Sequence, residues 1–454
     1  MSGTLAAVTT PQLRECPGCG LFQIVPALAA EMHAGCLRCG TPLRKTRRAP
    51  MAHSLALTIA ALILFVILWT TMLMRVSASG IVHEADLLAG PVELIRRGLW
   101  PVGLVVGFAT AFAPLSKYLT MAYVLIGLRM THPPPNMRGA FLFARRIGIW
   151  AMLDVLLLGV FVAYTKLGDL VTIDVGPAVY ALALLTVISL WADTALDPDA
   201  VWEAIEARGQ THVPMPAPML VPPVGRDLVG CEGCGLVSVP VRHAGEDHAH
   251  CPRCGSALHT RKPASISRTW AYLIAGAILY IPANYFPVLT VIQLGAGEPS
   301  TIIGGVEELI AAQLYPLAIL VLSASVLVPV MKLIGLVVLA MAALASSPDR
   351  HNAAGLRQRT AIYFIVAWIG RWSMVDIFME SLLGALVQFG GLVSIDPGIG
   401  ALAFCAVVIL TMLSAEAFDP RLMWDAAGMP VRQRTDAPNG PALAGHDAVR
   451  QPVL

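Results

Sequence analysis

The sequence has little charge and few aromatic residues for its length. Of 454 residues, only 13% are charged and 7% are aromatic, whereas 56% are hydrophobic; soluble domains average about 25% charged residues. A net charge of +2 is too small to indicate a nucleic-acid partner. Residues 54–74 and 400–413 lie within apolar runs of the length that a membrane helix needs, about 20 residues. The composition therefore predicts a polytopic membrane protein.

Motifs of common enzyme classes are also missing. The chain has no Gly-x-x-x-x-Gly-Lys-Ser/Thr loop for ATP phosphates, no Gly-x-Ser-x-Gly nucleophile turn and no His-Glu-x-x-His zinc motif. A secretory signal peptide fits poorly, because the first apolar run begins only after fifty residues and follows a cysteine-rich segment. We expect no catalytic residues and a protein that is not an enzyme.

Cysteine is confined almost entirely to two cassettes, which hold eight of the nine cysteines. Each has two Cys-x-x-Cys pairs separated by sixteen residues, and a glycine follows every pair: Cys16, Cys19, Cys36 and Cys39, then Cys231, Cys234, Cys251 and Cys254. Four thiolates at this spacing can surround one Zn²⁺ tetrahedrally. A domain under about 40 residues has too little core, so the metal would supply its folding energy.

The cassettes therefore predict two structural zinc ribbons. The alternative is a pair of redox-active dithiols, but redox Cys-x-x-Cys motifs normally occur singly. Whether each ribbon uses its own four cysteines, or exchanges pairs with the other, is open from the sequence.

The chain is one unit repeated. A shift of 215 residues places the first cassette on the second, and carries ELIRRGLWP (93–101) onto ELIAAQLYP (308–316). Beyond a short insertion the shift becomes 222, and GIWAMLD (148–154) meets GRWSMVD (370–376). Matches that hold their offset over long blocks indicate a tandem duplication.

The repeat divides the chain into six segments. We predict an all-α membrane protein in which each zinc ribbon precedes a four-helix transmembrane module. The segments are ribbon 1 (10–48), module 1 (49–207), a proline-rich linker (208–226), ribbon 2 (227–262), module 2 (263–428) and a disordered tail (429–454). The expected spans are 53–74, 99–128, 147–165 and 176–193, then 269–290, 314–345, 362–388 and 398–416.

Basic clusters favour one orientation. They occupy the segments around 44–48, 129–146, 261–268 and 350–359, whereas the loops at 293–313 and 390–398 are acidic or nearly neutral. Only the loop at 75–98 departs from this pattern, because it mixes both signs of charge. Positively charged loops stay in the cytoplasm. We expect eight spans, with both termini and both ribbons cytoplasmic.

Ionisable side chains lie inside the predicted spans, where each costs about 2.5–3.5 kcal/mol on insertion scales. They include Lys117 and Lys332 in the second span of each half, and Asp154 and Asp376 in the third. A lysine–aspartate ion pair within each half is the simplest way to lower this cost. The alternative is that the lysines reach the headgroups and the aspartates cap helix starts.

Hydroxyl groups extend the polar set in the second half. Ser325 lies seven residues before Lys332, on the same helical face. Thr411 belongs to the last span, and Pro329 can open a kink that lines a polar cavity. We predict a lipid or proton pathway through Ser325, Lys332, Asp376 and Thr411, with Lys117 and Asp154 as their counterparts in the first half.

The chain resembles the paraquat-inducible protein A family of bacterial inner-membrane proteins. The resemblance rests on CPGCG, CLRCG, CEGCG and CPRCG, the PLSK and PVMK segments, IPANYFPVL (281–289), and the TID and SID loops. It covers both halves, although the first half lacks an IPANYFP-like stretch.

The resemblance implies a role in lipid transport. Family members work with periplasm-spanning proteins built of mammalian-cell-entry (MCE) domains, so this chain would load or unload phospholipid at such a tube, through the polar cavity of module 2. Two alternatives are a membrane anchor for an MCE partner that moves no lipid, and a zinc or thiol redox sensor.

Overall fold

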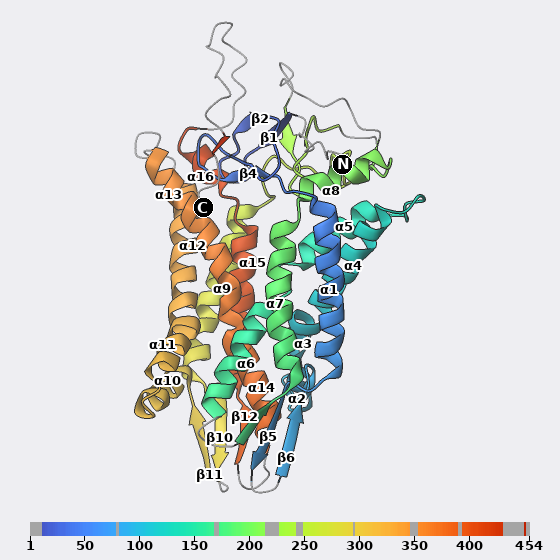
Figure 1. Ribbon diagram of the computed structural model, residues 1–454. Coiled ribbons are helices and arrows are strands. Elements are labelled where there is room, and N and C mark those ends of the chain that lie inside the picture. Colours follow the sequence, from blue (N-terminus) through green and yellow to red (C-terminus); the bar gives the residue numbers. More distant parts are fainter. Residues whose placement is uncertain are drawn as a thin grey trace, which may run out of the picture.

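Long helices form the body of the molecule, with the cysteine-rich segments at one end and small sheets at the other (Figure 1). The computed structural model describes residues 11–78, 81–167, 172–213, 227–241, 248–293, 296–345, 353–388, 393–429 and 449–450. Most of the predicted linker, and all of the predicted tail except residues 429 and 449–450, lie outside these ranges.

The first half begins with a long membrane helix. Its helical elements are α1 (Pro50–Thr70), α2 (Ala89–Arg96), α3 (Trp100–Gly107), the π-helical turn η1 (Phe108–Phe112), α4 (Ala113–Gly127), α5 (Met137–Ile147), α6 (Leu153–Leu167), α7 (Pro177–Ala195) and α8 (Pro198–Ala207). Its strands are β5 (Met74–Ala78), β6 (Ile81–Ala85) and β7 (Thr172–Val175).

The second half repeats this order. Its helical elements are α9 (Ser265–Tyr285), α10 (Ile302–Ala311), α11 (Tyr315–Leu322), the π-helical turn η2 (Ser323–Leu327), α12 (Val328–Leu344), α13 (Ala353–Ile369), the 3₁₀ turn η4 (Gly370–Met374), α14 (Val375–Leu386), α15 (Ile399–Ala417) and α16 (Arg421–Ala426). Its strands are β10 (Leu289–Gln293), β11 (Ala296–Ser300) and β12 (Val393–Pro397). The predicted duplication and the mostly helical fold are confirmed.

A proline explains the π-helical turn inside the second span of each half. Pro114 has no N–H group, so it cannot take its place in the helical hydrogen-bond ladder. The preceding N–H, of Ala113, donates to the carbonyl of Phe108 five residues back. Pro329 stands in the same position relative to η2. Such π-helical turns are frequent at functional sites.

Six helical segments among the described residues are long and apolar enough to cross a membrane: residues 50–70, 100–127, 177–195, 315–344, 354–386 and 399–417. The other two predicted spans correspond to α6 and α9. Helix α6 has 15 residues, about 22 Å at 1.5 Å per residue, which is shorter than a bilayer core of about 30 Å. The third span of the second half also begins earlier than predicted, at Ala353 instead of residue 362.

Two three-stranded sheets, which the sequence analysis did not predict, lie at the end opposite the cysteines (Figure 1). Their strand orders, β6-β5-β7 and β11-β10-β12, are equivalent, and every pairing is antiparallel. Ion pairs also account for the mixed loop at 75–98: Arg75 pairs with Glu84 at 2.6 Å, and Arg97 pairs with Glu93 at 2.7 Å. Arg97 further contacts Asp396 of β12.

The two halves share one hydrophobic core. Helix α14 packs against α6 and α2 of the first half. Gly90 of α2 permits this approach, because a Cβ atom there would lie 2.3 Å from the Ser381 hydroxyl oxygen. The modules are therefore joined along their length and not only by the linker.

Candidate functional site

Lys332 is fully buried within module 2. Its Nζ donates to the Thr411 Oγ1 at 2.8 Å and to the Gly370 carbonyl at 3.2 Å. The structure thus brings Lys332 and Thr411 together, but the predicted pair of Lys332 with Asp376 is wrong. Among the residues that the structure describes, no carboxylate lies within ion-pair distance of this amine.

The equivalent lysine of the first half has a carboxylate partner. Lys117 pairs with Asp193 at 2.8 Å, and not with the predicted Asp154. The position equivalent to Asp193 in the second half is Ala415, so Lys332 has no such partner. Asp193 is exposed, whereas Lys332 is enclosed by η4 and α15. Asp154 lies half-buried in the first turn of α6.

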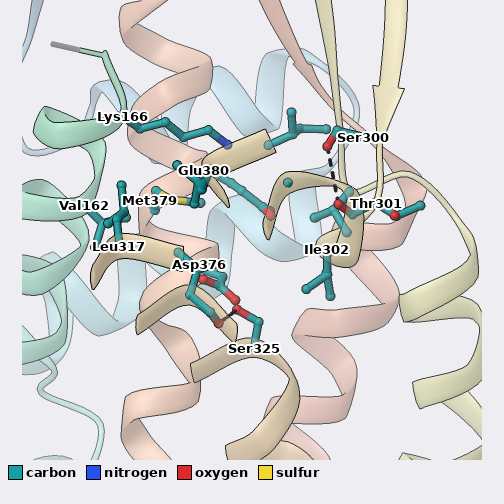
Figure 2. Close-up of a pocket in the computed structure, with 15 residues that line it drawn as sticks. Val162, Lys166, Ser300, Thr301, Ile302, Leu317, Ser325, Asp376, Met379 and Glu380 are labelled. Atoms are coloured by element: carbon teal, nitrogen blue, oxygen red, sulfur yellow. Dashed lines mark hydrogen bonds between the residues drawn. The ribbon is translucent and has the colours of Figure 1, made fainter. Parts of the chain in front are cut away.

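Asp376 and Ser325 instead line a cavity at the boundary between the halves. Figure 2 shows Asp376 of α14 beside Ser325 of η2, with Glu380 one helical turn further along and Lys166 of α6 extending over it. The cavity volume is about 30 Å³, enough for a water molecule. Asp376 Oδ1 is buried and has no hydrogen-bond partner in the described part of the chain.

Glu380 and Lys166 were not predicted as site residues. Glu380 is buried in α14, and the equivalent position of the first half is Leu158. A carboxylate inside an apolar span is a functional candidate by itself, so the signal was present in the predicted span 362–388. Lys166 lies just beyond the predicted span 147–165, and only the packing of α6 on α14 brings it to the cavity.

The cysteine cassettes form two compact clusters. Ribbon 1 consists of β1 (Gln12–Glu15) paired with β2 (Phe22–Val25), and β3 (His33–Gly35) paired with β4 (Pro42–Lys45). Ribbon 2 contains β8 (Val229–Gly230) paired with β9 (Val237–Ser238). Part of the tail expected to be disordered, β13 (Val449–Arg450), pairs with β3.

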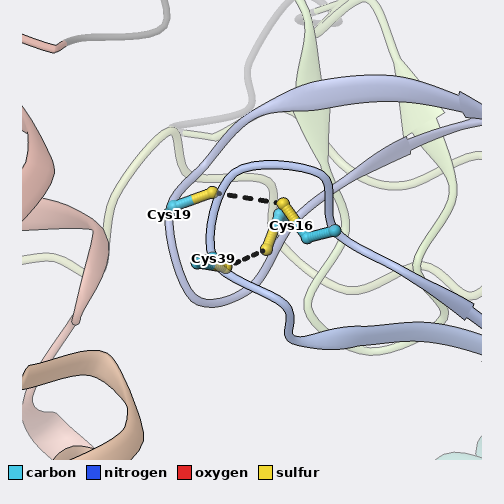
Figure 3. A group of neighbouring side chains, drawn as sticks. Cys16, Cys19 and Cys39 are labelled. Carbon is cyan, nitrogen blue, oxygen red and sulfur yellow. Dashed lines mark hydrogen bonds between the residues drawn. The ribbon is translucent and has the colours of Figure 1, made fainter. Parts of the chain in front are cut away.

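Each cluster uses the four cysteines of its own cassette. Figure 3 shows Cys16, Cys19 and Cys39 of the first cluster. Tight turns bring the sulfurs together, and the glycines after the pairs adopt φ angles of +71° to +79°, which favour glycine. Within each cluster the four Sγ atoms lie within 4.8 Å of one another, with Cys16 and Cys39 at 3.4 Å. Tetrahedral ligation at about 2.3 Å requires separations of roughly 3.8 Å. Each cluster can therefore hold a metal ion.

The packing of the two cysteine clusters is exchanged between the modules. Ribbon 1 packs its cysteine cluster on module 2, against Leu339 of α12, Tyr363 of α13 and Trp424 of α16. Ribbon 2 packs its cluster on module 1, against Phe141 of α5 and Trp202 of α8. Trp202 and Trp424 are therefore both buried beneath a ribbon.

A buried ion-pair network joins both ribbons to module 2. Arg421 pairs with Glu15 of ribbon 1 and Glu232 of ribbon 2, each at 2.9 Å, and with Asp419 at 2.8 Å. Glu15 also accepts a hydrogen bond from the Gly230 N–H at 2.8 Å.

The network shifts the pKa of two carboxyl groups in opposite directions. Burial alone would raise the pKa of Asp419, but the hydrogen bonds and charge of Arg421 outweigh it and hold this pKa below its usual value. For Glu15, burial prevails over the attraction of Arg421 and raises the pKa. Arg421 is therefore the main counter-charge of both carboxyl groups.

Comparison with known proteins agrees with this architecture. The family model described as paraquat-inducible protein A matches the chain twice, over residues 51–206 and 266–428. "Intermembrane transport protein PqiA" of Escherichia coli (strain K12) is 32% identical over 413 residues, covering 90% of this chain and 95% of that protein. "Lipophilic envelope-spanning tunnel protein A" of the same organism is 30% identical over 415 residues, covering 91% of each chain.

A further relative, the "Probable intermembrane transport protein" of Haemophilus influenzae (strain ATCC 51907 / DSM 11121 / KW20 / Rd), is 26% identical over 426 residues, which cover 92% of this chain and 97% of that protein. No solved structure matches. These relatives are named as transport or tunnel proteins and not as enzymes, in agreement with the sequence analysis. With both modules matched and identity extending along nine-tenths of its length, the chain belongs to the paraquat-inducible protein A family.

Proposed function

We propose that this protein is the inner-membrane subunit of a lipid-transport system. It would load phospholipid into, or unload it from, a periplasm-spanning tube of MCE-domain proteins. The names of the Escherichia coli relatives, which refer to intermembrane transport and to an envelope-spanning tunnel, support this role.

The observation that carries the proposal is the buried polar cluster between the halves. Asp376, Glu380 and Ser325 meet at a boundary where α14 of one module packs on α6 of the other. Polar groups this deep in a membrane protein are costly and mark substrate or ion pathways. The cavity admits water but no acyl chain, so lipid passage requires α14 to separate from α6. Lys332 and Thr411 form a second polar contact in module 2.

The proposed topology has eight spans, which are the six apolar segments together with α6 and α9. Both ribbons and both termini would face the cytoplasm, and the two sheets would face a periplasmic partner. We infer that the metal in each ribbon is Zn²⁺, because four thiolates with no open position are typical of structural zinc sites. Metal analysis of the purified protein should find two zinc ions per chain, and one after Cys234→Ser.

Site-specific photo-crosslinking in cells with labelled phospholipid tests the pathway. One cross-linking residue would replace Ser325, and a control would replace Ile319, which is 67% exposed on the neighbouring helix α11. We expect lipid at both positions, because Ile319 faces the bilayer. Only the capture at Ser325 should be lost when Asp376 is replaced by alanine.

Capture at Ile319 alone would contradict the proposal, since the cavity would then be closed to lipid. The protein would in that case act as an anchor for its partner. Membrane abundance must be measured for every variant. An effect of Asp376→Ala that follows abundance alone also favours the anchor.

A further inference from the structure

A second, larger cavity lies between the halves at the ribbon end. Its volume is about 650 Å³, within the usual range for ligand sites. Helix α5 and ribbon 2 form one wall, and the start of α9 and the end of α15 form the other. None of the residues predicted from the sequence as a lipid or proton pathway lines it.

Positive charge dominates this cavity. Four basic side chains line it, and two acidic ones, Glu232 and Glu416; the basic residues are Arg145, Arg146, Lys262 and Arg268. Glu232 is already paired with Arg421. The cavity therefore retains a net positive charge that a bound anion would balance.

Two of these four basic side chains, those of Arg146 and Arg268, have no partner in the described part of the chain, whereas the other two donate to backbone carbonyls. Lys262 Nζ donates to the Glu416 carbonyl at 2.5 Å, and Arg145 donates to the Gly233 carbonyl at 3.3 Å. Arg146 and Arg268, by contrast, are exposed and make no side-chain hydrogen bond or ion pair within the described ranges. Guanidinium groups bind phosphate through two parallel hydrogen bonds, so these two arginines are suited to a phosphate group.

The depth of the cavity indicates which phosphate it holds. Arg268 lies in the first turn of α9, and Glu416 lies in the last turn of α15. The charged side chains of this cavity therefore lie at the ends of proposed membrane helices, at the level of lipid headgroups. The larger apolar side chains of the lining are Leu142, Ile149, Tyr272 and Leu413. A ligand that matches both parts has a phosphate head and an acyl chain.

We propose that this cavity is a binding site for the phosphate headgroup of a phospholipid, held between Arg146 and Arg268. Basic pockets between membrane helices on the cytoplasmic side bind lipid headgroups in this way. The proposal rests on the transport function above and gives it a site at the leaflet opposite the two sheets. A lipid bound here would contact both modules, so a change in their packing could release it.

Photoactivatable phosphatidylglycerol, incorporated in nanodiscs with the full-length protein, tests this site. Mass spectrometry would locate the cross-links, which are expected on peptides containing Tyr272 or Leu413. The double variant Arg146→Gln/Arg268→Gln should reduce this capture about tenfold, equivalent to about 1.4 kcal/mol. Arg129→Gln is the matched control, because Arg129 is an exposed arginine just beyond the end of α4 and outside the cavity lining.

Three results would overturn the inference. The first is equal capture by the double variant and the wild-type protein. The second is complete displacement of the lipid by millimolar inorganic phosphate, which would identify a site for soluble phosphate. The third is absence of capture here while cross-linking at Ser325 persists; the transport proposal would then stand without this site. Loss of cross-linking at Ser325 with capture retained here would instead contradict the pathway alone.

Discussion

Replacing Arg421 by methionine should weaken the contacts that hold the two ribbons to each other and to module 2. Arg421 and Asp419 are 5% and 1% exposed, and the substitution leaves the carboxylates of Asp419 and Glu15 buried without their principal cation. Removing one partner of a buried ion pair costs about 3–5 kcal/mol. We take about 3 kcal/mol, because Arg261 remains 3.4 Å from Glu15. Such a loss increases the population of the opened form on the order of 100-fold.

Hydrogen exchange of backbone amides measures this opening directly. The reporter is the Gly230 N–H, which donates to Glu15 across the contact between the ribbons. Exchange there should be on the order of 100-fold faster in Arg421→Met. Glu232→Gln is the control, because Glu232 is 53% exposed and its pair should contribute about 1 kcal/mol or less. If Arg421→Met exchanges no faster than this control, the network does not hold the ribbons. Adding Glu15→Gln should restore part of the protection.

Three further predictions follow from the same contacts. The folded-state pKa of Asp419 is depressed. The stabilising contribution of this carboxylate is therefore present above its unfolded pKa of about 3.9 and is lost as the pH falls through the folded value. Thermal unfolding at a series of pH values should show this loss, and Asp419→Asn should reduce the pH dependence. Lys332→Met should leave the unfolding temperature unchanged or higher, since an apolar side chain replaces a buried amine, yet abolish lipid capture at Ser325. Lys117→Met should lower the free energy of unfolding by about 1 kcal/mol or less. Trp424→Ala should lower the free energy of unfolding by about 3–5 kcal/mol and speed hydrogen exchange in ribbon 1, whereas Trp202→Ala should speed it in ribbon 2. Faster hydrogen exchange in the ribbon of the same half as the replaced tryptophan would contradict the crossed packing of the clusters.

Features fixed by local spacing were predictable from the sequence. The cysteine clusters depend on two short turns and their glycines, and the duplication is visible in matched segments. The start of helix α8 is also set locally, because the Asp197 side chain accepts hydrogen bonds from the N–H groups of Asp199 and Ala200. Each of these inferences needs only residues that are close in the chain.

Features set by packing between distant segments were not predictable. The lysine–aspartate pairing failed because a π-helical turn precedes Lys332 and a 3₁₀ turn precedes Asp376, so simple helical periodicity does not give their directions. The sheets were missed because short strands between apolar spans leave little periodic signal. Glu380 is different, because its charge lies within a predicted span and marks it as a functional candidate from the sequence alone.

The crossing of the ribbons constrains how such a chain could originate. A single-copy ancestor with the same contacts would pack the cysteine cluster of each ribbon on the module of another subunit. It would have to be a two-fold symmetric dimer in which the ribbons were swapped between subunits. Fusion of two such copies would turn an intermolecular contact into an intramolecular one, at high effective concentration. The halves would then be free to diverge, and Glu380 and Asp193, each present in one half only, are marks of that divergence.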